Sequence, residues 1–178
     1  MEIKTKTRTE QILTVMYVLA WIAFIGFMIQ AGAILISFGV SWVNPAAASD
    51  LYHRMNFEKL RQLNFWYYTC AVSFVVTQTV MKAFVWQLVV KTLSKISMMN
   101  PFTKETVQRL ELISYVMLGI WVVGQLNSAY TDWLLKWTGE EFGSRMDDGS
   151  IFVAGLVFVI SQMFKRGIEI QSENELTV

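Results

Sequence analysis

The chain has 178 residues, of which 54% are apolar and 16% are charged, whereas about 25% of the residues of an average soluble domain are charged. A single cysteine and a single histidine exclude a disulfide-stapled secreted domain and a zinc-finger module. A net charge of +1 gives no sign of a surface for direct nucleic-acid binding. This composition predicts an integral membrane protein in contact with the lipid bilayer.

Four apolar segments predict membrane-spanning helices, because a span needs about 20 predominantly apolar residues. They cover residues 12–43, 65–90, 110–135 and 150–166. We expect one membrane domain over residues 1–178, an all-α four-helix bundle whose C-terminal helix extends into a cytoplasmic tail at 167–178. In the long first segment, Gly26, Gly32 and Gly39 offer places for a bend or a close helix contact. That segment is too long for the apolar core of a signal peptide, which has about 7–15 residues.

The distribution of Lys and Arg predicts the orientation of these spans. The terminal segments and the middle loop share one side of the membrane and hold nine of these residues: Lys4, Lys6, Arg8, Lys91, Lys95, Lys104, Arg109, Lys165 and Arg166. The other two loops hold five: Arg54, Lys59, Arg61, Lys136 and Arg145. Both termini are therefore expected in the cytoplasm, with aromatic residues such as Trp42 and Trp137 forming a belt at the outer interface.

Two loops contain sequence patterns that predict local structure. Asn44 and Pro45 should end the first helix, and residues 51–63 read as an amphipathic helix, either lying at the interface or offering a binding surface. In the middle loop, Thr103 suits the N-cap of the third helix, and Phe102 with Val107 suits a hydrophobic staple. This inner loop is either a structural helix start or a docking site.

The polar tail after the fourth span is expected to stay helical to about Glu173. Lys165 and Arg166 can each pair with Glu169 on one side of this helix, and Ile168 lies on the same face as Phe164. Two interpretations remain open for the apolar stripe: it packs on the inner loop of the same chain, or it binds a partner.

Catalytic chemistry is not indicated by the sequence. No acidic residue lies in the middle of an apolar segment, and His53 and Cys70 are too few for a metal cluster. We therefore expect no enzyme activity, no catalytic residues, no metal and no cofactor. The acidic outer loop around Glu140, Glu141, Asp147 and Asp148 lacks the spacing of a calcium loop.

Polar side chains inside the spans are candidates for function by their position. They are Gln78, Lys82, Gln125, Asn127 and Gln162. Lys82 is the only charge that interrupts a span, and it falls toward the inner end of the segment 65–90. Its side chain either reaches the cytoplasmic interface or joins a polar cluster between helices, as packing or as part of a substrate path.

Two stretches resemble the bacterial membrane family catalogued as domain of unknown function 2975. One is Asn100-Pro101-Phe102-Thr103 followed by Arg109-Leu110, and the other is the C-terminal run from Gln162 to Val178. Glu175 stands where the family pattern has Asp. The resemblance implies a four-helix protein of the bacterial inner membrane without an assigned activity. Genes of this family often neighbour a small helix-turn-helix regulator, which is a potential partner.

These observations favour a non-enzymatic membrane protein that binds or restrains a small cytoplasmic DNA-binding regulator. The candidate partner-binding residues lie on the predicted inner face: Asn100, Pro101, Phe102, Thr103, Phe164, Lys165, Arg166, Gly167, Glu169, Glu173 and Asn174. The alternative is a small channel or transporter, in the form of a homo-oligomer, that uses the polar residues within the spans.

Overall fold

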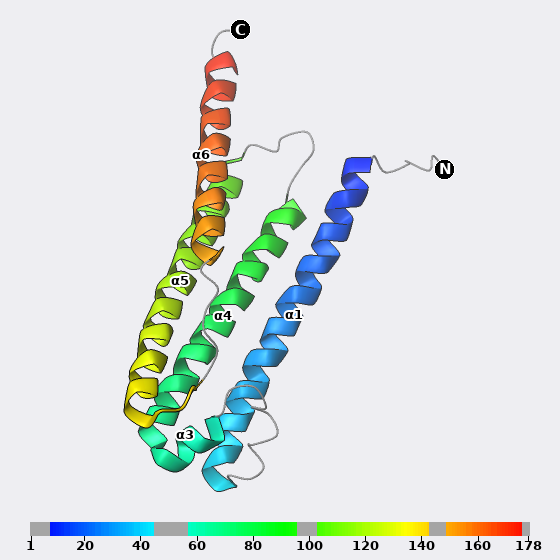
Figure 1. The fold of residues 1–178 in the computed structure, drawn as a ribbon. Coiled ribbons are helices and arrows are strands. Elements are labelled where there is room, and N and C mark those ends of the chain that lie inside the picture. Colours follow the sequence, from blue (N-terminus) through cyan, green and yellow to red (C-terminus); the bar gives the residue numbers. More distant parts are fainter. Residues whose placement is uncertain (1–7, 45–56, 96–102, 143–148, 176–178) are drawn as a thin grey trace, which may run out of the picture.

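The fold is known from a computed structural model that describes residues 8–44, 57–95, 103–142 and 149–175. These residues form five helices: α1 (Arg8–Val43), α3 (Phe57–Leu63), α4 (Phe65–Lys95), α5 (Lys104–Thr138) and α6 (Gly149–Glu175) (Figure 1). Four of them, all but α3, are long and apolar enough to cross a membrane. The predicted all-α fold is confirmed, and the chain is a multi-pass membrane protein.

The long helices pack in the order of the sequence. The main contacts join α1 to α4, α4 to α5, and α5 to α6, so the helices follow one another across the molecule in Figure 1. The start of α1 and the end of α6 lie at one end, which we call the tail end. The short helix α3 lies at the opposite end, which we call the α3 end.

Local polar groups explain where several helices begin and end. As predicted, α1 ends before Asn44. Asn64 separates α3 from α4, and its side-chain Oδ1 accepts a hydrogen bond of 2.8 Å from the amide of Trp66, which satisfies one of the free donors of the new helix. Gly139 ends α5 in the left-handed conformation, with φ at 74°, and its amide donates to the carbonyl of Leu135. Glycine adopts this conformation without steric cost.

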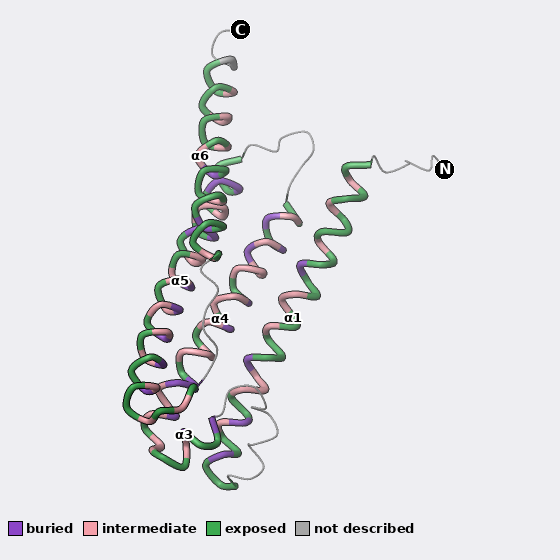
Figure 2. The backbone as a smooth tube through the Cα atoms, viewed as in Figure 1, coloured by how far each residue is buried: buried purple, intermediate pink, exposed green. Residues whose placement is uncertain are grey.

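Small side chains form most of the helix contacts, as expected where lipid cannot drive association. The buried residues of α1 are Ala20, Ala31, Ser37 and Ser41, and α6 buries Ala154 and Ser161. Most of the large apolar residues of α1 are exposed, and exposed positions recur along the whole of α1 in Figure 2. Outward apolar residues and inward small residues are the pattern of a helix in a bilayer.

The glycines of α1 do not make a close helix contact, which was one of the two roles considered for them. A Cβ on Gly26, Gly32 or Gly39 would meet no other atom within 4 Å. A close approach occurs instead at Gly119 on α5, where a Cβ would lie 2.8 Å from Cε of Met81 on α4. The positions of the glycines in the sequence do not show which glycines contact another helix and which face the lipid.

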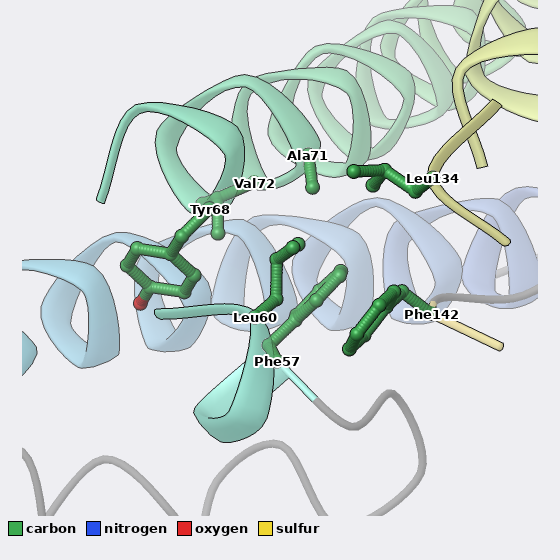
Figure 3. Packing of buried hydrophobic residues seen from close by; sticks show 7 residues of the cluster. All are labelled: Phe57, Leu60, Tyr68, Ala71, Val72, Leu134 and Phe142. Carbon is green, nitrogen blue, oxygen red and sulfur yellow. The ribbon is translucent and has the colours of Figure 1, made fainter. Parts of the chain in front are cut away.

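A compact apolar core closes the α3 end of the molecule. Its buried members come from α3, α4, α5 and the segment after α5 (Figure 3): Phe57, Leu60, Tyr68, Ala71, Val72, Leu134 and Phe142. The described part of the amphipathic segment 51–63 is therefore packed into the protein through Phe57 and Leu60. The hydroxyl of Tyr68 shares a hydrogen bond of 3.1 Å with Oγ of Ser41, so this core also anchors α1.

Aromatic side chains surround this core on the surface. Trp42, Trp66 and Trp137 are 72%, 76% and 61% exposed. Trp133 and Trp137 stack with their centroids 6.3 Å apart. Exposed tryptophans gathered at one end match the interfacial belt predicted from the sequence.

Replacing Leu60 with Ala should destabilise the α3 end, because the side chain is fully buried. Removal of a buried leucine costs about 2–5 kcal/mol of unfolding free energy. The matched control is Leu63→Ala, since Leu63 lies in the same helix but is 55% exposed. Unfolding in mixed detergent micelles, followed by circular dichroism, measures both. Equal losses in the two variants would contradict the packing of α3 described above.

Candidate functional site

The position of α6 along α5 is fixed by a polar contact between the two helices. Nε2 of Gln162 donates a hydrogen bond of 3.0 Å to Oε1 of Glu111, 51 residues earlier in the chain. Both residues are half-buried, and a hydrogen bond to a carboxylate is stronger than one between neutral groups. This pair sets the register in which the antiparallel helices pack.

In this register α6 begins well inside the molecule. Gly149 lies thirteen residues before Gln162, or about 20 Å along the helix, which places it level with about residue 124 of α5. The end of α5 at Thr138 is roughly 20 Å farther toward the α3 end. At its other end α6 extends past the start of α5, as Figure 1 shows.

A groove lies between α5 and α6 at the tail end. Its volume is about 330 Å³, and it is lined by Lys104, Val107, Gln108, Glu111, Lys165, Ile168 and Glu169. Val107 is buried and Ile168 half-buried, so the apolar lining comes from both helices. Two ammonium groups, two carboxylates and one amide provide the polar lining. We call this feature the tail groove.

The α5 side of the tail groove is built by a well-capped helix start. Thr103 is the N-cap, as predicted, and its Oγ1 accepts a hydrogen bond of 3.2 Å from the amide of Thr106. Glu105 pairs with Lys95 at the end of α4, at 2.8 Å, and with Arg109 one turn later. The pair with Lys95 connects the adjacent ends of α4 and α5. The staple partner of Val107, Phe102, lies outside the described residues.

The α6 side is a helix that continues to Glu175, as expected for the tail. The pairing of Arg166 with Glu169 is confirmed at 2.8 Å. Of the candidate partner-binding residues on α6, Lys165 and Glu169 line the tail groove. Arg166 and Glu173 are exposed on the same helix.

The remaining candidate partner-binding residues are placed less directly. Phe164 and Gly167 are half-buried, and Thr103 is exposed at its cap. Asn174 belongs to α6, but only its backbone is described. Asn100, Pro101 and Phe102 lie outside the described residues. The structure thus brings the Thr103 segment and the α6 tail to the same end of the molecule.

The polar candidates within the spans are found at different depths. Gln162 pairs with Glu111, whereas Asn127 is buried sixteen residues farther along α5, a separation of about 24 Å along the axis. Gln78 and Gln125 are half-buried.

Lys82 lies two residues past the midpoint of α4, because this helix continues to Lys95, beyond the expected end at residue 90. It is therefore farther from the helix end than the sequence suggested.

Glu111 was not expected from the sequence to belong to a site. Its carboxylate stands at the start of the third apolar segment, and its partner is 51 residues away. Lys104 and Gln108 were likewise not singled out, although they line the tail groove. Lys104, Gln108 and Glu111 follow one another at intervals of four and three residues. This spacing is the local sequence pattern that indicates a shared helix face.

Replacing Gln162 with Leu should loosen α6, because Glu111 would keep a half-buried carboxylate without its amide donor. Leaving a charged group unsatisfied costs about 1–3 kcal/mol. Glu111→Gln is the matched control, since a neutral amide oxygen can still accept from Gln162. Unfolding in mixed micelles compares the two variants. If Gln162→Leu is as stable as the original protein, the pair does not hold the register.

Comparison with known protein families gives a match over most of the chain. Residues 50–178 match the model of a family described as "Protein of unknown function (DUF2975)". No curated protein and no solved structure matches the chain.

Proposed function

The chain belongs to the DUF2975 family of unknown function, and we propose that it is a non-enzymatic protein of the bacterial inner membrane that binds a small cytoplasmic helix-turn-helix regulator. The observation that carries this proposal is the tail groove, which contains Lys165 and Glu169 among its lining residues. These two were selected from sequence as partner-binding candidates.

The orientation of the chain supports a cytoplasmic position for the tail groove. The start of α1, the end of α4, the start of α5 and the end of α6 lie at the tail end (Figure 1). Nine Lys and Arg residues belong to these segments and their flanks, against five in the other two loops of the sequence. An excess of Lys and Arg marks the cytoplasmic side of inner-membrane proteins.

The lining of the tail groove suits a helix of a protein partner. Val107 and Ile168 offer apolar contacts, while Lys104, Glu111, Lys165 and Glu169 offer charges of both signs. Recognition of an amphipathic helix uses such an arrangement, with apolar anchors in a groove and polar contacts at its rim. A regulator held here at the membrane would be kept away from DNA.

A channel or transporter is the second candidate, and it has less support. A continuous polar path needs side chains that follow one another through the membrane. Gln162 and Asn127 are separated by about 24 Å along the helix axis, and Gln162 is engaged with Glu111.

The groove can be tested with two isoleucines of α6. Ile168→Ala removes an apolar contact of the tail groove, whereas Ile170→Ala changes a side chain that is 47% exposed and does not line the groove. The tagged full-length protein is expressed in its native host and purified in mild detergent. Co-purified proteins are then quantified by mass spectrometry, and the proposal expects a small helix-turn-helix regulator among them.

We expect Ile168→Ala to reduce the recovered regulator about tenfold, as for a contact worth 1–2 kcal/mol, and Ile170→Ala to leave it unchanged. Deleting Gly167 to Val178 should abolish recovery while membrane insertion persists. Recovery that is unchanged by Ile168→Ala and by the deletion would contradict the proposal.

A further inference from the structure

A second cavity lies about midway along the long helices, and all four of them contribute to it. Its volume is about 360 Å³, within the range of about 300–1,000 Å³ that is usual for small-molecule sites. Phe27 of α1, Trp86 of α4, and Met117 and Ile120 of α5 supply apolar lining. The polar lining is Lys82 of α4 and Ser150 of α6. We call this feature the Lys82 cavity.

Lys82 lies near the middle of α4. Seventeen residues separate it from Phe65 and thirteen from Lys95, which correspond to about 26 and 20 Å of helix. Within the described residues Lys82 makes no hydrogen bond and no ion pair. Because an isolated charge within a span is costly, intramembrane lysines are expected to have an anionic partner or a function.

Ser150 adds a second polar group to the same cavity. Its Oγ is buried, and it has no hydrogen-bond partner in the described part of the chain. Buried hydroxyls without a partner are uncommon and call for an explanation. Ser150 also belongs to the first turn of α6, where the helix dipole favours negative charge. Both polar features therefore favour an anion, and none of the described residues that line the cavity supplies a carboxylate.

The rest of the lining determines which anion fits. A small hydrated anion would lose its water against Phe27, Trp86, Met117 and Ile120 without compensation. A carboxylate attached to a hydrocarbon chain avoids this cost, because its chain gains the apolar contacts while its head meets the charge.

We propose that the Lys82 cavity binds a long-chain fatty acid, with the carboxylate paired to the ammonium of Lys82 and accepting a hydrogen bond from the hydroxyl of Ser150. The hydrocarbon chain lies against the apolar lining. This site is separate from the tail groove, so its ligand does not depend on the proposed regulator.

The test measures binding of tritiated palmitate to the purified full-length protein in nanodiscs of phosphatidylcholine. We expect saturable binding at about one palmitate per chain. Lys82→Met should weaken the affinity at least about tenfold, as for loss of a hydrogen bond to a charged group. Lys82→Arg should stay within about threefold of the original, since it keeps the charge. Lys91→Met is the matched control, because Lys91 lies on the same helix but is exposed.

Competitors distinguish the chemistry of the ligand. Hexadecanol, which has the same chain without the charge, should compete at least about tenfold more weakly than palmitate, and acetate and phosphatidylglycerol should not compete. Ser150→Ala should weaken binding severalfold. This second variant tests the proposal if circular dichroism shows that Lys82→Met does not fold. Affinity unchanged by both variants, equal competition by hexadecanol, or displacement by acetate or phosphatidylglycerol would overturn the proposal.

Discussion

The hydrogen bond between Gln162 and Glu111 determines the height of α6 in the molecule. Both candidate sites depend on it, because α6 supplies Lys165, Ile168 and Glu169 to the tail groove and Ser150 to the Lys82 cavity. A shift of α6 by one helical turn, about 5.4 Å, would separate these residues from their partners on α5 and α4. One polar contact at the edge of the apolar region thus positions two features far apart along the same helix.

The two sites differ in chemistry because they differ in surroundings. At the tail end, Lys104, Lys165 and Glu169 belong to a charged rim that suits a protein surface in water. Deeper in the molecule, Lys82 stands among apolar side chains, where a charge has much larger energetic consequences. The core around Leu60 and Tyr68 at the other end serves to hold α1, α3, α4 and α5 together.

The helices themselves could be predicted because each depends on local sequence. Apolar length predicted the four spans, Asn44 the end of α1, and Thr103 the start of α5. The pairing of Arg166 with Glu169 followed from their spacing on one helix. These features depend on residues that are near one another in the chain.

The sites could not be predicted in the same way, because they join residues that are distant in sequence. The contact of Glu111 with Gln162 spans 51 residues, and the apolar length of α6 contains no information about its height beside α5. The end of α4 was also not predicted, because this helix remains helical through Lys91 to Lys95, beyond the apolar segment that defined the expected span. A hydropathy pattern does not show whether a helix continues beyond the end of an apolar segment.

The register of α6 is measured most directly by disulfide cross-linking in a Cys70→Ser background. The pair Glu111→Cys with Gln162→Cys should form a disulfide readily in membranes, because these side chains are in contact. The pair Asn127→Cys with Gln162→Cys should not, since about 24 Å separates the two levels on α5. If α6 instead began level with the end of α5, Gln162 would lie beside Asn127, and the second pair would cross-link while the first would not. That result would contradict the position of α6 on which both sites depend.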